Sequence, residues 1–257
     1  MVLAAGGWPG AWTVLWVTAA MVGARTCAMA TNRVVDRWID ADNPRTAARH
    51  LPRGILAVRD VRLLAVGGAA LMLLSAAMLN WLCVALAPLA LVFLVGYSYT
   101  KRVTWASHWI LGFTDGIAAA GGWIAVRAEL GLPAVVLWLA LTVWIAGFDV
   151  IYACQDIAFD RARGLRSVPA RFGVRAALRV ARVNHALTAG ALAALGWVAG
   201  LGPAYWIGWL VVVGLLAYEH SLVSADDLSR VDVAFFNVNG YIAVIVFVAV
   251  LGGLWRG

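Results

Sequence analysis

Charged side chains are scarce in this sequence: 13% of its 257 residues are charged, whereas 63% are hydrophobic. The mean hydropathy is +0.86. A soluble domain has about 25% charged residues, so this composition excludes an ordinary soluble protein and indicates an integral membrane protein. The apolar runs also lack the alternation of apolar and polar residues that membrane β-strands need, so they predict helices. We therefore expect an all-α helical bundle that forms one membrane domain over residues 1–257.

Cysteine is rare as well, and the amino terminus has no basic segment ahead of an apolar run. The three cysteines, Cys27, Cys83 and Cys154, all fall in apolar segments. This placement predicts small buried side chains and excludes a disulfide framework or a zinc site. The first ten residues, MVLAAGGWPG, do not have the pattern of a signal peptide.

Lysine is nearly absent, because Lys101 is the only one and arginine supplies the rest of the positive charge. A net charge of +7 would suggest nucleic acid binding in a soluble protein. In a membrane protein it indicates instead cytoplasmic loops, anionic ligands and the surface of the lipid bilayer. We therefore expect no nucleic acid partner.

The hydropathy pattern predicts about eight membrane-spanning helices, since each crossing needs about 20 mostly apolar residues. They are expected near residues 9–36, 60–79, 82–99, 105–126, 134–156, 176–199, 204–223 and 235–255. The basic residues, apart from Arg25, Arg127 and Arg256, lie in or beside the loops after the first, third, fifth and seventh helices. The positive-inside rule places these loops in the cytoplasm, on one side of a bacterial-type inner membrane.

A first acidic face is predicted within residues 25–40, RTCAMATNRVVDRWID. On a helix, Asn32 lies about 20° from Arg25 on one side and Asp36 about 20° from it on the other, and Asp40 lies about 40° further round. Each carboxylate in an apolar helix costs about 2.5–3.5 kcal/mol, so this face requires a compensating charge.

A second acidic face is predicted within residues 149–161, DVIYACQDIAFDR. Asp149, Asp156 and Asp160 repeat the same spacing of seven and then four residues. Four helices separate the two segments, so their helices are parallel, and the pattern suggests an internal duplication with two pseudo-repeated halves.

Oxygen ligands without histidine or cysteine beside them favour Mg²⁺ or Mn²⁺ over zinc. Magnesium usually binds through few carboxylates together with a substrate phosphate. Lys101, Arg102 and the loop arginines would supply countercharge for that phosphate, although Lys101 and Arg102 could equally be membrane-surface anchors. A metal, a diphosphate and a membrane-buried pocket together suggest a lipid diphosphate as substrate.

Four segments resemble the UbiA-type membrane aromatic prenyltransferases. They are NRVVDRWID (32–40), DADNPRTAARHLPRG (40–54), YSYTKRVTWASHWILG (97–112) and DVIYACQDIAFDRARGLRSVPARFG (149–173). Within the family they are most similar to the bacterial 4-hydroxybenzoate polyprenyltransferase-like branch, which includes enzymes of menaquinone synthesis. The resemblance covers essentially the whole chain and implies a Mg²⁺-dependent transfer of a polyprenyl group from its diphosphate to an aromatic acid in quinone biosynthesis.

The resemblance also implies roles for particular residues. Asn32, Asp36 and Asp40 would hold one Mg²⁺ against the diphosphate, and Asp156 and Asp160 would hold a second. Tyr97, Lys101 and Arg102 would contact the diphosphate. Arg25 and Asp149 would act deeper in the pocket, on the aromatic acceptor or the reacting carbon.

Other interpretations of several residues remain open at this stage. Arg25 contacts a ligand or forms a salt bridge with an aspartate, and Asp115 pairs with a neighbouring helix or lines the pocket. For His108, His185 and His220 we expect hydrogen bonds at helix ends rather than metal binding.

The family usually has nine helices, so we expect the first family helix to precede residue 1. Another acceptor of the same family, namely a dihydroxynaphthoate, a porphyrin or a glycerol phosphate, is an alternative. A membrane transporter would need polar residues through the full membrane depth, whereas here they cluster at one side.

Overall fold

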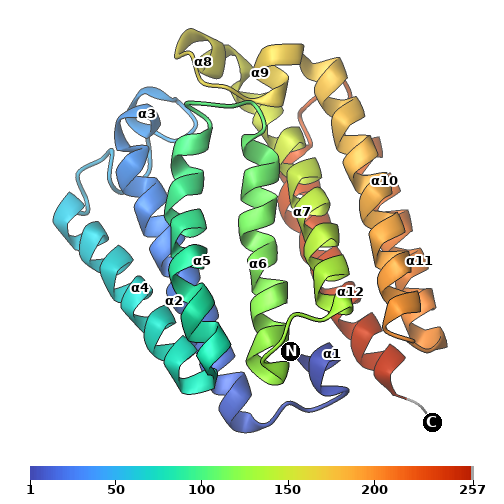
Figure 1. Cartoon of the computed structure of the whole chain (residues 1–257). Helices are drawn as coiled ribbons and strands as arrows, with labels where there is room; N and C mark the ends of the chain where they lie inside the picture. The colour runs from blue at the N-terminus through green and yellow to red at the C-terminus, as the bar shows by residue number, and fades with distance from the viewer. Residues whose placement is uncertain (256–257) are drawn as a thin grey trace. The chain divides into compact units, whose positions relative to one another are not determined.

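Helices form all the regular structure of residues 1–255, the part of the chain that this computed structural model describes (Figure 1). Long helices match the eight predicted segments. They are α2 (Ala11–Val35), α4 (Val58–Leu79), α5 (Trp81–Thr100), α6 (Ser107–Arg127), α7 (Leu132–Ala153), α10 (Val174–Val198), α11 (Pro203–Ser221) and α12 (Asn239–Leu254). Arg256, which the charge pattern places outside the cell, lies beyond the described residues.

Short helices lie in the segments between the long ones. These are α1 (Val2–Ala5), α3 (Arg37–Asp42), the 3₁₀-helix η1 (Cys154–Asp156), α8 (Ile157–Ala162), α9 (Val168–Phe172) and the π-helix η2 (Val233–Val238). Helices α3, α8 and α9 lie outside the predicted membrane-spanning segments.

Six segments within residues 1–255 are long and apolar enough to cross a membrane by length and composition. They are 11–35, 58–79, 81–100, 107–127, 132–162 and 233–254. Two long helices lie outside this set: α10 carries three arginines in its first nine residues, and α11 ends with Glu219 and His220 in its last turn. The prediction of an all-α integral membrane bundle is confirmed.

The chain divides into two units, each described here by itself. The amino-terminal unit consists of residues 10–100 and 124–129, and the carboxy-terminal unit consists of residues 1–9, 101–123 and 130 onward. The division leaves the expectation of a single membrane domain over residues 1–257 untested.

Helices α2, α4 and α5 make up most of the amino-terminal unit, and α2 packs closely along α4 (Figure 1). Gly23 and Gly68 permit this approach. A Cβ on Gly23 would lie 2.6 Å from the Gly68 carbonyl oxygen, and a Cβ on Gly68 would lie 2.7 Å from the Cys27 nitrogen. Small residues let helix backbones come together in a membrane, where packing rather than water exclusion drives association. The pair therefore fixes the helix that carries the first acidic motif.

The carboxy-terminal unit has its core among α7, α10, α11 and α12. Tyr205 shows how this core keeps polar groups satisfied, because its buried hydroxyl donates to the Leu192 carbonyl at 2.6 Å. Helix α6 lies against α7, where the Trp138 indole donates to the Phe113 carbonyl at 2.8 Å. This packing holds the start of α6 beside the second acidic motif.

The π-helix η2 was not predicted. Its carbonyls at Ala234 and Phe235 accept from the side-chain amide of Asn239 at 3.1 and 3.2 Å, and the same amide donates to Glu219 at 3.3 Å. A π-helical turn leaves carbonyls without their usual α-helical partners. Here the side-chain amide of Asn239, at the start of α12, donates to two of them.

Candidate functional site

Each acidic motif sits at a break in a helix. Asp36 separates α2 from α3 with φ −91° and ψ 4°, and Asp156 separates η1 from α8 with φ −101° and ψ 7°. In both places the next aspartate of the motif, Asp40 or Asp160, lies in the first turn of the short helix that follows. The spacing argument assumed one continuous helix through each motif, and the breaks change the direction of the second carboxylate. The matching geometry supports the predicted internal duplication.

In the amino-terminal unit, the first acidic pair is buried and surrounded by polar partners. Asp36 is 3% exposed and accepts from the Asn32 amide at 3.2 Å. Asp40 is 5% exposed and forms an ion pair with Arg49 at 2.7 Å, while Arg33 lies 3.8 Å from its other carboxylate oxygen. That second oxygen, Oδ2, has no hydrogen-bond partner among the described residues. The structure thus places Asn32 against Asp36, and both Asp36 and Asp40 interact electrostatically with Arg33.

The loop after α3 folds back onto this pair. Thr46 donates through its hydroxyl to the Asp40 carbonyl at 3.0 Å, which places Arg49 against the Asp40 carboxylate. Tyr97, half-buried on α5, interacts electrostatically with Arg33 in the same cluster. Arg25 is exposed on α2 and forms no ion pair within the described part of the chain, so the salt-bridge interpretation is not supported.

In the carboxy-terminal unit, the second acidic pair lies beside the only lysine. Asp160 accepts from the Ser167 hydroxyl at 2.9 Å and interacts electrostatically with Asp156, Lys101 and His108. The Lys101 carbonyl accepts the backbone N–H of Arg166 at 2.7 Å.

A further contact ties the same two segments together, because the Arg166 guanidinium donates to the Val103 carbonyl. The loop that carries Lys101 and Arg102 is thereby docked on the loop after the second motif. Lys101 therefore lies in the same unit and the same cluster as Asp156 and Asp160.

Asp149 lies on α7, seven residues before Asp156, which is about 10 Å along a helix. Its side chain is 26% exposed and contacts His108 at 2.6 Å. Sequence reasoning expected His108 to make hydrogen bonds near a helix end, which is confirmed, since it is the second residue of α6. Its pairing with Asp149 was missed, because the two residues are 41 positions apart and no spacing rule connects them.

The remaining polar candidates all belong to the carboxy-terminal unit. Asp115 is exposed on α6. His185 and His220 contact each other at 3.0 Å between ring nitrogens. His220 lies in the last turn of α11, as expected, but His185 lies in the middle of α10, so the prediction of a helix-end position is wrong for His185.

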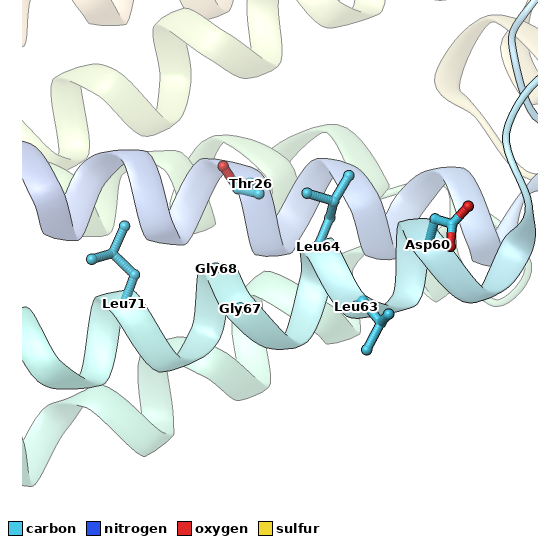
Figure 2. A pocket seen from close by; sticks show the side chains of 7 residues that line it. All are labelled: Thr26, Asp60, Leu63, Leu64, Gly67, Gly68 and Leu71. Carbon is cyan, nitrogen blue, oxygen red and sulfur yellow. The ribbon is translucent and has the colours of Figure 1, made fainter.

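A hollow of about 580 Å³ opens between α2 and α4 of the amino-terminal unit (Figure 2). Figure 2 shows Leu63, Leu64 and Leu71 on α4 beside Thr26 on α2, with Asp60 at one end. A neighbouring hollow of about 310 Å³ shares Thr26 and Leu64 and continues to Arg33 and Arg49. The lining is mostly apolar, which suits a lipid chain better than a polar ligand.

The acidic pairs fit Mg²⁺ by their chemistry. Each pair offers two carboxylates, the first adds the Asn32 amide, and the buried Oδ2 of Asp40 lacks a donor. Within residues 1–255, three or more histidine, cysteine, aspartate or glutamate side chains nowhere form a ready cage for a metal. Magnesium prefers such incomplete oxygen sets, since it keeps waters and takes further oxygens from a substrate phosphate.

Comparison with known proteins agrees with this chemistry. The UbiA prenyltransferase family model matches residues 1–252. The 4-hydroxybenzoate octaprenyltransferase of Xanthomonas campestris pv. campestris is 33% identical over 255 residues, which cover 98% of this chain and 83% of that protein. The enzyme of the same name from Pectobacterium atrosepticum is 30% identical, with coverage of 98% and 87%.

Solved structures show the same fold. A UbiA homologue from Aeropyrum pernix K1 superposes with a TM-score of 0.89 at 31% identity, covering 97% of this chain and 92% of that one. A UbiA homologue from Archaeoglobus fulgidus, solved with GPP and Mg²⁺, has a TM-score of 0.74 at 18% identity, with coverage of 96% and 92%. The chain is a membrane prenyltransferase and belongs to the UbiA prenyltransferase family.

Proposed function

We propose that this enzyme transfers a polyprenyl group from polyprenyl diphosphate to an aromatic acid, in a Mg²⁺-dependent step of quinone biosynthesis. The acceptor is 4-hydroxybenzoate or a related dihydroxynaphthoate. The protein sits in a bacterial-type inner membrane with its active site facing the cytoplasm, as the placement of the arginines favours.

The repeated helix break carries this proposal. Two carboxylate pairs, each at the end of a long apolar helix and each beside cationic side chains, are an expensive arrangement in a membrane protein unless a metal and an anion are bound there. Arg33 and Arg49 accompany the first pair, and Lys101 accompanies the second. The names of the sequence relatives support the same substrates.

The residues divide the work of the reaction. Asn32, Asp36 and Asp40 would hold one Mg²⁺, and Asp156 and Asp160 would hold the other. Tyr97, Lys101 and Arg102 bind the diphosphate oxygens. When bound there, Mg²⁺ would supply positive charge that stabilises the departing diphosphate. The carbon–oxygen bond of the allylic diphosphate then breaks, and its electron pair leaves with the diphosphate.

Arg25 and Asp149 act on the aromatic acceptor. The exposed guanidinium of Arg25 suits the carboxylate of the aromatic acid, which arginine binds through two parallel hydrogen bonds. The allylic carbon bonds to a ring carbon, and the proton of that ring carbon passes to the carboxylate of Asp149, which restores aromaticity. The apolar helices keep water away from the cation.

The proposal is tested by incubating the purified chain with a labelled polyprenyl diphosphate and a panel of acceptors. We expect a prenylated aromatic acid, identified by mass spectrometry, whose formation stops with EDTA and resumes with added Mg²⁺. A product formed only with glycerol phosphate or a porphyrin would overturn the acceptor, and turnover that survives EDTA would overturn the metal requirement.

Replacing Lys101 by alanine is expected to raise the KM for polyprenyl diphosphate about 10–100-fold, since a charge-assisted hydrogen bond contributes about 1.5–3 kcal/mol. The KM for the aromatic acid should stay unchanged. Initial-rate kinetics with each substrate varied in turn measure both values. The matched control is Arg230→Ala, which removes an exposed cation from the loop before η2. Weaker acceptor binding with unchanged diphosphate binding would contradict this role.

A further inference from the structure

His108 is held from both sides of its ring. Its Nδ1 lies 2.6 Å from Oδ2 of Asp149 on α7, and its Nε2 lies 3.2 Å from the backbone nitrogen of Val168, the first residue of α9. The residue is 3% exposed, so water does not compete for either ring nitrogen. This arrangement connects the partly exposed Asp149 to the loop that follows the second acidic pair.

The two contacts together define the protonation of the ring. A backbone N–H can only donate, so Nε2 of His108 must present a lone pair to Val168. The neutral ring then carries its proton on Nδ1 and donates it to Asp149. This hydrogen bond engages Oδ2 of Asp149, and the other oxygen of the carboxyl group remains for a ligand.

The position of the Val168 N–H is itself fixed. Ser167 caps α9 by accepting the Ala170 N–H at 3.2 Å and donates its own hydroxyl to Asp160 at 2.9 Å. The donor that holds His108 is therefore set by a local cap and an aspartate of the second metal pair. Asp149, His108 and the start of α9 form one continuous hydrogen-bonded line inside the carboxy-terminal unit.

We propose that His108 is a positioning residue for prenyl transfer: it holds one oxygen of Asp149 and aims the free oxygen of that carboxylate at the ring proton of the acceptor. The inference rests on the proposed function, because it assigns to Asp149 the proton lost in aromatic substitution. The carbon–hydrogen bond of the ring breaks, its electrons restore aromaticity, and the proton ends on the free oxygen of Asp149. His108 does not carry the proton onward, since its Nε2 lone pair is occupied by Val168.

The test separates the two hydrogen bonds with two amides of different length. An asparagine amide reaches the position of Nδ1, so His108→Asn keeps the donor to Asp149 and loses the contact with Val168. A glutamine amide reaches the position of Nε2, so His108→Gln keeps the contact with Val168 and loses the donor to Asp149. Thermal melting in detergent checks that both variants fold.

We expect His108→Gln to lower kcat by about 10–100-fold, as for the loss of a group that orients a reacting residue, with the KM for polyprenyl diphosphate unchanged. With an acceptor deuterated at the prenylated carbon, a primary isotope effect on kcat should appear, since proton removal becomes slow. The same effect should appear in Asp149→Asn. His108→Asn should recover most of the lost rate without the isotope effect.

Equal losses in His108→Asn and His108→Gln, with no isotope effect in either, would show a purely structural histidine and overturn the inference. That result leaves the proposed function standing, provided that the wild-type chain forms the prenylated acid. A wild-type chain that forms no prenylated aromatic product overturns the proposed function itself, and the two failures are therefore distinguishable.

Discussion

Replacing Asp36 or Asp156 by alanine is expected to lower kcat by about 10³-fold or more, while the protein still inserts in the membrane. Metal stabilisation of a leaving group contributes several kcal/mol, and each 1.36 kcal/mol corresponds to a tenfold change in rate. Asp36 and Asp156 lie at the two helix breaks, and each supplies one carboxylate of its acidic pair. Initial rates with saturating substrates, together with the amount of protein in the membrane fraction, measure the effect.

A second readout distinguishes lost metal from lost fold. Mn²⁺ bound to the purified chain with a non-reactive diphosphate analogue should fall from two ions to one in either variant, as counted by electron paramagnetic resonance. The matched control is Asp226→Ala, which removes an exposed carboxylate from the loop between α11 and η2. If Asp36→Ala and Asp156→Ala turn over at the rate of this control, the assignment of the two metal sites is wrong.

The long helices were predictable because a membrane imposes a length and an apolar composition on each crossing. The segments near residues 60–79 and 204–223 agree with α4 and α11 to within two residues at each end. The breaks at Asp36 and Asp156 were not predictable, since neither glycine nor proline marks them. They are set by tertiary contacts, among them the return of Arg49 to Asp40.

The sequence predicts the part of the candidate site in which residues of one segment share a helical face. The grouping of Asn32, Asp36 and Asp40 follows from four-residue spacing, and the observed contact between Asn32 and Asp36 agrees with it. The partners that come from other helices, such as His108 for Asp149, depend on how α6 packs against α7, which no local pattern encodes. That both acidic pairs bind the same diphosphate stays a prediction.

Replacing Gly68 by leucine is expected to destabilise the amino-terminal unit by about 3 kcal/mol or more, at the upper end of the cost of overpacking, because the obstructing atoms belong to the backbone. A Cβ there would lie 2.7 Å from both the Cys27 nitrogen and the Gly23 carbonyl oxygen, so α2 and α4 must separate. Melting in detergent measures the loss. Mn²⁺ affinity should fall with it, since α2 ends at the first acidic pair.

Gly67→Leu is the matched control, because Gly67 is the neighbouring residue on α4 and lines the open hollow in Figure 2. A Cβ on Gly67 would meet no atom within 4 Å among the described residues, so this variant should melt at the wild-type temperature or slightly above it, as glycine is a poor helix former. Two leucines one position apart thus change hydrophobicity equally and differ only in the face they occupy. If both lower the melting temperature alike, close packing of α2 on α4 is not what holds the first acidic motif in place.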